Sequence, residues 1–290
     1  DGQLFSTESG FRTALNGIYV ELSNNALYGG ELSVDAVEIL AQRYDFSGNT
    51  TNAYRLGTYN YTIDYAKSKF AAVWEKAYSL IANCNKLLEY AEKNEEVLTG
   101  KMRKMIIGEA MALRAFLHFD MLRLFGPVYK LNPKAESIPY NETSKVMALP
   151  LLAADSVIHE KVLRDLDEAE SLLADSDPVI EGGPMASLEN DQNVYLRYRQ
   201  LRMNYYAVLA LKARVYLYAG ERGKALEMAR KLLADAKVNE HFPAVDPNKL
   251  LANQSNPDRV FSTEVLAGIY KKDRKDIYTG YFDSEQAGNN

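Results

Sequence analysis

Residues 108–128 read GEAMALRAFLHFDMLRLFGPV, and they constrain the fold more than any other stretch of the chain. Nearly every position is apolar or small, and the polar exceptions are Glu109, Arg114, His118, Asp120 and Arg123. A helix that is apolar on almost all sides is buried on more than one side. Gly126 can adopt a left-handed cap and Pro127 cannot continue a helix, so we expect the helix to end there. The five polar side chains argue against a membrane span. The pattern predicts the central helix of a layered helical solenoid.

Bulk composition excludes some classes of protein. The 290 residues suffice for one large or two ordinary domains, and 47% hydrophobic with 25% charged residues is ordinary for a globular protein. The net charge of −5 lacks the electrostatic footprint of a nucleic-acid binder, so no nucleic-acid partner is expected. Cys84, the single cysteine, can form no intramolecular disulfide and lies in an apolar helical stretch, so we expect a buried, unreactive thiol.

Hydrophobic periodicity predicts a mainly helical chain with long loops. The expected helices are 7–23 (capped by Ser6 or Thr7), 32–42, 67–93, 101–125, 155–174, 195–219 and 224–237. The expected loops are 43–66, 132–150, 175–193 and 242–259. The β-rich run 260–270 predicts a strand, a small amount of β structure near the C-terminus, and the tail 283–290 is polar.

The segments 195–219 and 224–237 resemble a tetratricopeptide helix pair. The pattern of small residue, aromatic, Gly-acidic turn and small residue is carried by Ala213, Tyr216, Gly220, Glu221 and Ala225. It departs from the repeat where a large aromatic is expected, because Ala229 stands there. Loops of different length separate the other helices. We therefore expect a degenerate tetratricopeptide-like solenoid over residues 1–238, and over 239–290 the loop and strand that begin a truncated C-terminal region.

The central helix also resembles the hallmark helix of the SusD/RagB family. The matching positions are Leu113, Arg114, Ala115, Phe116, Phe119, Asp120, Met121, Arg123, Leu124, Phe125, Gly126 and Val128. Further blocks are similar to the family's and occur in its order: ALNGIY at 14–19, the Trp74–Tyr78–Ile81–Asn83–Asn85 spacing, and the stretches 165–169, 209–220 and 262–270. The family's lipid-bearing N-terminal cysteine and leader do not appear, and the family normally runs on past residue 290. The chain, which starts at Asp1, looks like an incomplete member.

The resemblance implies a function. Members are nutrient-binding lipoproteins on the outer-membrane surface of Bacteroidetes. They bind a glycan and pass it to a SusC-type TonB-dependent transporter, and they touch the membrane only through an N-terminal lipid anchor that this chain does not contain. Two alternatives stay open. One is a peptide-binding member of the same family, and the other is a tetratricopeptide adaptor that binds a partner protein in its concave groove.

No catalytic or metal constellation is visible in the sequence, so we predict no enzyme, no metal and no cofactor. His118, His159 and His241 are scattered and do not form a metal motif, and His118 is expected to be a satisfied core histidine. The acidic run Asp165, Asp167, Glu168 and Glu170 is expected to form a solvated helix face.

The tyrosine-rich loop 43–66 is the predicted ligand site. Aromatic rings suit the apolar C–H faces of sugars, and carboxylates suit their hydroxyls. The candidate residues are Tyr44, Tyr54, Tyr59, Tyr61, Asp64 and Tyr65. By resemblance, the family's glycan-contacting aromatics lie partly in the loop before the helix that Trp74 marks and partly in the C-terminal half, which we expect to be missing here. The alternative is that these tyrosines pack the loop onto the scaffold. Arg114, Asp120 and Arg123 are expected to tie buried helices together, with Asp120 and Arg123 paired.

Overall fold

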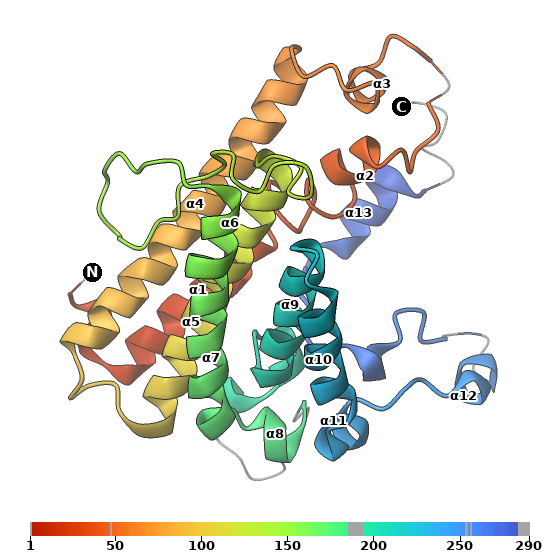
Figure 1. Cartoon of the computed structure of the whole chain (residues 1–290). Helices are drawn as coiled ribbons and strands as arrows, with labels where there is room; N and C mark the ends of the chain where they lie inside the picture. The colour runs from red at the N-terminus through yellow and green to blue at the C-terminus, as the bar shows by residue number, and fades with distance from the viewer. Residues whose placement is uncertain (1, 47, 185–193, 253–254, 256, 284–290) are drawn as a thin grey trace. The chain divides into compact units, whose positions relative to one another are not determined.

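The computed structural model describes residues 2–46, 48–184, 194–252, 255 and 257–283, and these residues are predominantly helical (Figure 1). The chain divides into two compact units: a larger unit of Asp1–Leu15 with Ile81–Gly268, and a smaller unit of Asn16–Leu80 with Ile269–Asn290. None of the described helices combines the length and apolar character needed to cross a membrane. The mainly α solenoid expected from the sequence is confirmed. The division predicted at residue 238, between the helical repeat region and the start of the C-terminal region, stays a prediction.

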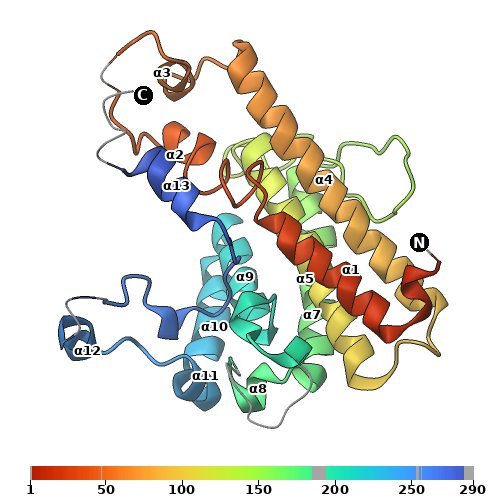
Figure 2. The same ribbon diagram turned by 180° about the vertical axis from the view of Figure 1, so that it is seen from behind.

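Helix α5 (Gly100–Phe125) forms the centre of the larger unit, and most of its residues from Met105 onward are buried. It packs along α7 (Leu163–Ser176), as Figures 1 and 2 both show. The two helices approach closely because Gly108 has no side chain: a Cβ there would lie 2.8 Å from Cγ of Leu173. The predicted central buried helix is therefore present.

Gly126 ends α5, but not by the left-handed cap that we expected. Its backbone is extended, with φ −80° and ψ 174°. A Cβ at this position would lie 2.5 Å from the carbonyl oxygen of Leu122. Glycine is therefore needed here because the backbone passes close to the last turn of the helix, not because φ is positive.

The helix before α7 is irregular. A short α6 (Ala154–Ser156) leads into a π-helical turn, η2 (Val157–Val162), and then into α7 without a break. The sequence predicted one regular helix over 155–174. Periodicity alone does not reveal the wider π turn.

The helix pair α9 (Tyr205–Tyr218) and α10 (Arg222–Leu233) packs side by side (Figure 2). Gly220 forms the turn between them with φ +81°. The predicted start of the first helix at residue 195 is wrong, because Asn204 caps α9 by accepting a hydrogen bond from the Ala207 amide at 2.9 Å. Residues before it form the short turns η3 (Val194–Leu196) and η4 (Arg199–Leu201). The second helix stops at Leu233. Asp235 then caps a separate helix, α11 (Ala236–His241).

The strand predicted over residues 260–270 is wrong. The segment forms a single short turn, η5 (Ser262–Glu264), and Phe261 before it has φ +51°. The backbone contact from Gly268 to the carbonyl of Gln200 does not develop into a ladder. Within the described residues, β pairing is limited to one isolated bridge between Glu136 and Ala153. Two predicted loops also contain short helices, α8 (Val179–Gly182) and α12 (Pro247–Ala252). The predicted polar tail lies outside the described residues from 284 onward.

The smaller unit is built around α2 (Ala36–Leu40), α3 (Asn52–Gly57), the first part of α4 (Asp64–Lys93), and α13 (Arg274–Tyr281). Its core is formed by Ala36, Ile39, Leu56 and Ala66. Helix α1 (Glu8–Leu22) contributes residues to both units, and the Thr7 hydroxyl caps it by accepting from the Gly10 amide at 3.1 Å. The predicted loop 43–66 is partly helical. Thr51 caps α3 through its side chain, and α4 begins at Asp64 rather than at residue 67.

Candidate functional site

Two tyrosines of the predicted site stand out from the surface of the smaller unit. Tyr59 is 53% exposed and Tyr61 is 49% exposed. Their ring centroids are 6.4 Å apart with an angle of 57° between the planes, and Tyr61 also meets the ring of Phe70 edge-on at 5.7 Å. We call Tyr59 and Tyr61 the tyrosine platform. Half-exposed rings with a fixed mutual angle can bind the apolar face of a ligand and keep their edges in water.

The other three tyrosines of the predicted site pack within the smaller unit. The hydroxyl of Tyr44 donates to the carbonyl of Val34 at 2.5 Å, and burial raises the pKa of this hydroxyl. Tyr54 meets Phe46 edge-on at 6.4 Å. The ammonium of Lys69 lies 4.9 Å from the ring centre of Tyr65, whose pKa is raised by burial. Tyr44 and Tyr65 pack against the unit's core. Their roles as ligand contacts stay predictions.

Asp64 and Trp74 lie on α4. Asp64 is exposed in the helix's first turn, where a carboxylate complements the helix dipole, and Lys67 lies 3.9 Å from it. Trp74 is half-buried, and its ring centroid is 4.5 Å from that of Tyr78. The structure thus brings Tyr59 and Tyr61 together but does not join all six predicted residues in one contact set.

The platform is built on two helix ends that cap each other. Gln42 follows α2 and Tyr59 follows α3, and both have left-handed backbone, with φ +57° and +62°. Arg43 and Asn60 each donate back to a carbonyl five residues earlier, which completes a Schellman motif at each end. Glycine is the usual residue at such a position.

The side chains of Gln42 and Tyr59 each make a contact that glycine could not make. The Gln42 amide donates to the carbonyl of Gly57 at 2.5 Å, and the Tyr59 hydroxyl donates to the carbonyl of Leu40 at 3.3 Å. Each bond satisfies a carbonyl that the end of a helix leaves without an intrahelical partner. The two helices therefore hold each other's C-terminal ends, and the platform is fixed at this junction.

A charged cluster beside the core of the smaller unit was missed by the sequence analysis. Lys69 binds Glu31 at 2.5 Å and Asp35 at 2.7 Å, and Tyr281 of α13 donates to Asp35 at 2.7 Å. Burial raises the pKa of Glu31, although its bond to Lys69 opposes this shift. The cluster joins segments that are far apart in the sequence, and no local motif indicates such a contact.

The polar residues of the central helix do tie segments together. Arg114 is buried, donating to Asp165 of α7 at 2.6 Å and to Asn85 of α4 at 2.9 Å. Tyr140 also donates to Asp165 at 2.6 Å. Burial would raise the pKa of Asp165, but the bonds from Arg114, Tyr140 and Arg164 hold it below its ordinary value. The prediction that Asp165 belongs to a solvated face is wrong, because this carboxylate is fully buried.

The remaining predictions for this helix have mixed outcomes. Asp120 and Arg123 pair at 2.8 Å, as their spacing predicted, and Arg123 is 40% exposed. Asp120 is 12% exposed and also lies 3.8 Å from Arg214 of α9, so it links two helices as expected. His118 is fully buried, as expected for a core histidine. It accepts from the Asn141 amide at 2.9 Å through Nε2, so its Nδ1 donates to the carbonyl of Arg114 at 2.9 Å. Burial lowers the pKa of His118 to about 3.

The single cysteine, Cys84, lies on α4 and is buried. Burial raises the pKa of its thiol to about 12, consistent with an unreactive cysteine.

A second buried ion cluster was missed. Arg199 is fully buried, binding both carboxylate oxygens of Asp177 at 2.9 Å and Glu109 of α5 at 2.7 Å. Asp177 also accepts from the amides of Val179 and Tyr205. Arg199 lies in the segment that we predicted as regular helix. Its charge alone gave no sign of burial, because isolated charges are normally exposed.

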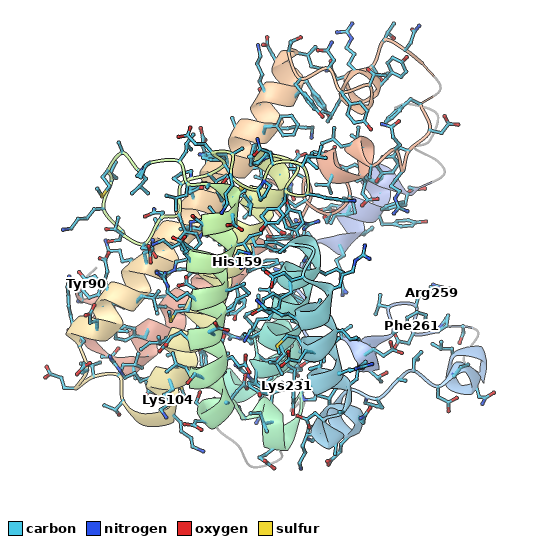
Figure 3. All side chains as sticks on the ribbon, viewed as in Figure 1. Tyr90, Lys104, His159, Lys231, Arg259 and Phe261 are labelled. Atoms are coloured by element: carbon cyan, nitrogen blue, oxygen red, sulfur yellow. The ribbon has the colours of Figure 1, made fainter. Side chains whose placement is uncertain are left out.

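The three histidines lie on different elements: His118 on α5, His159 on η2 and His241 at the end of α11. His159 on η2 lies 3.2 Å from Glu221 and 3.4 Å from Asp155, and Figure 3 labels its position. Over the part of the chain that the structure describes, no group of three His, Cys, Asp or Glu residues is placed to hold a metal ion.

Comparison with known proteins gives a consistent family. A SusD-like family profile, described as starch-binding and associating with the outer membrane, matches residues 6–181, more than half of the chain. The curated SusD-like protein P2 of Formosa agariphila is 22% identical over 174 residues, which cover 59% of this chain and 32% of that protein. The chain therefore belongs to the SusD-like family.

Solved structures share the fold. A SusD superfamily protein of Bacteroides vulgatus matches with a TM-score of 0.62 at 21% identity, covering 85% of this chain and 51% of that one. A SusD-like carbohydrate-binding protein of the same organism matches with a TM-score of 0.59 at 23% identity, covering 79% and 45%. The chain thus spans about half the length of these solved relatives and about a third of the curated one.

Proposed function

We propose that this chain is the helical part of a nutrient-binding protein of the outer-membrane surface, and that its ligand is an oligosaccharide. Membership of a family described as starch-binding and associating with the outer membrane supports this proposal. The observation that carries it is the tyrosine platform, two half-exposed rings at a fixed angle on a junction of two helices. The other predicted contacts, Tyr44, Tyr54, Asp64 and Tyr65, would support the platform or extend it.

The proposed role is capture rather than catalysis. The family is described as starch-binding, and two of the chain's titratable groups, His118 and Asp165, are used in structural contacts. Each aromatic contact contributes only about 0.5–1.5 kcal/mol, so binding on such a platform is reversible, which suits a protein that hands its ligand on. We therefore propose no enzyme activity and no cofactor.

The recipient in this proposal is a SusC-type TonB-dependent transporter, and an N-terminal lipid anchor would hold the protein at the surface. Purification of the native lipoprotein from detergent-solubilised outer membranes should recover such a transporter with it. A native protein found only in the cytosol would contradict the proposal.

Calorimetric titration of the 290-residue chain with maltoheptaose, and in parallel with cellohexaose, tests the ligand class. We expect Tyr59→Ala and Tyr61→Ala to weaken binding. The matched control is Tyr198→Ala, because Tyr198 is 46% exposed and also has left-handed backbone, but lies in the larger unit. An equal loss of affinity in Tyr198→Ala would show that Tyr59 and Tyr61 have no specific role in binding.

A peptide is the second ligand class, since some members of the family are expected to bind peptides. Titration with a mixed tryptic peptide library under the same conditions separates the two classes. Peptide binding that depends on Tyr59 and Tyr61, with no response to either glycan, would replace the oligosaccharide in this proposal.

A further inference from the structure

The junction beneath the tyrosine platform has a feature that a packing role does not require. Two consecutive helix ends, after α2 and after α3, both place a large residue where glycine is usual. Left-handed backbone costs a residue other than glycine about 1–2 kcal/mol. Such strain persists where the surrounding structure fixes it, and it concentrates at functional sites.

The cost at Gln42 is offset by a contact that glycine could not make. Its side-chain amide reaches the carbonyl of Gly57, across fifteen residues of sequence. Gly57 is itself buried, and a Cβ there would lie 2.9 Å from the ring of Phe46. The end of α3 is therefore held in place from two sides, and Tyr59 follows only two residues later.

The cost at Tyr59 is not offset by burial, because the residue is 53% exposed. Its hydroxyl bond to the carbonyl of Leu40 is long, at 3.3 Å, and lies in an exposed environment. A glycine or asparagine would suit this backbone better. The exposed ring is what the strained position provides.

We propose that Gln42 is a positioning residue for Tyr59: its bond to Gly57 fixes the end of α3, so that the Tyr59 ring is presented to ligand at a set angle to Tyr61. This inference rests on the proposed function and extends it to a residue that acts through Tyr59. Fixing the ring beforehand lowers the entropy lost on binding. Losing the Gln42 bond should therefore weaken binding without unfolding the unit.

Three substitutions at Gln42 test the bond. Gln42→Glu keeps the length and the backbone strain but replaces the donor with an acceptor. Gln42→Lys restores a donor, and Gln42→Gly removes both the bond and the strain. We expect Gln42→Glu and Gln42→Gly to raise the Kd for maltoheptaose about three- to tenfold, and Gln42→Lys to retain most of the affinity. The melting temperature of Gln42→Gly should stay close to that of the unaltered chain.

A second pair of variants, at Tyr59 and Tyr198, separates the effect of backbone strain from the effect of losing the ring. Tyr59→Asn suits left-handed backbone and removes the ring, so the protein should keep its melting temperature and lose affinity. Tyr198→Asn relieves the same strain in the larger unit and should leave affinity unchanged. Unchanged affinity in both Gln42→Glu and Gln42→Gly, with affinity lost in Tyr59→Asn, overturns the positioning role alone.

A ligand-free measurement keeps the inference separate from the proposed function. In protein labelled with ¹³C-tyrosine, Gln42→Glu should shift the ring resonances of Tyr59 and leave those of Tyr198 unchanged. An unmoved Tyr59 resonance overturns the positioning role even if glycan binds. Failure of the unaltered chain to bind either glycan or peptide, with the resonance shifted as expected, overturns the proposed function and leaves the geometric link between Gln42 and Tyr59 supported.

Discussion

Arg114 of α5 donates its Nε–H to a carboxylate oxygen of Asp165 on α7 across 2.6 Å, and both side chains are almost completely buried. Asn85 and Tyr140 bind the same pair, so the guanidinium and the carboxylate have hydrogen-bonded partners from four segments. A buried charge is tolerated when it is paired and hydrogen-bonded. This network joins α4, α5, α7 and the loop between α5 and α6, which carries Tyr140.

Removing one charge of this pair should destabilise the protein strongly. Asp165→Asn leaves Arg114 buried without its counter-charge, and we expect a loss of about 3–5 kcal/mol. Urea unfolding monitored by circular dichroism measures it. Asp167→Asn on the same helix is the control, because that carboxylate is 60% exposed and should matter little. Similar losses in the two variants would show that the network does not have the role assigned to it.

Helix α5 shows which features of the fold could be predicted from the sequence pattern and which could not. Its burial, its length and the Asp120–Arg123 pair could be predicted from spacing, because helical periodicity is a local property. The partner of Arg114 could not, since Asp165 lies 51 residues away and only the packing of α5 on α7 brings it close. For the same reason, the fully buried Arg199 gave no local signal.

In the candidate site too, local features could be predicted from the sequence and long-range contacts could not. The tyrosines of loop 43–66 could be identified by composition, but which of them pack and which stand out depends on the core of the smaller unit. The junction of Gln42 and Tyr59 was hidden because the usual marker of such a helix end, glycine, is absent from both positions. The strand predicted at 260–270 failed because β propensity does not supply a partner strand.

Acid should destabilise the fold through His118. Burial lowers its folded pKa to about 3, whereas an unfolded histidine titrates near ~6.5. Between these values the unfolded chain binds more protons, so stability is complete above about pH 6.5 and falls as the pH drops toward 3. From pH 7 to 4.5 the loss from this residue should be roughly 2–3 kcal/mol.

Urea unfolding of the unaltered protein and of His118→Gln at pH 7 and pH 4.5 measures this contribution. The variant should be less stable at pH 7 and should lose less on acidification. Asp165 acts in a lower window: its lowered pKa makes its contribution disappear only as the pH falls below the ordinary carboxyl range. An equal pH dependence in the variant would exclude His118 as the source.

The contact between α5 and α7 should tolerate no added methyl group at Gly108. A Cβ would lie 2.8 Å from Leu173 Cγ, so Gly108→Ala should cost about 1–3 kcal/mol despite its better helix propensity. Gly17→Ala in α1 is the matched control, because no heavy atom lies within 4 Å of its Cβ. That change should stabilise the protein by roughly 0.5–1 kcal/mol. Thermal unfolding of the two variants should therefore shift in opposite directions.

Tyr61 and Tyr65 should respond differently to the same truncation, although both are predicted ligand residues. Tyr61 is about half exposed, so Tyr61→Ala should lower glycan affinity by about 1 kcal/mol, the magnitude of an aromatic contact, and change the melting temperature little. Tyr65 packs on the core of the smaller unit and lies under Lys69, so Tyr65→Ala should lower the melting temperature first. Complete truncation of a buried aromatic costs about 3–5 kcal/mol, and half-burial should give a smaller loss. Calorimetry and thermal unfolding on the same two proteins decide the matter. If Tyr65→Ala weakens binding while the melting temperature stays fixed, Tyr65 belongs to the ligand surface, and the platform is wider than Tyr59 and Tyr61.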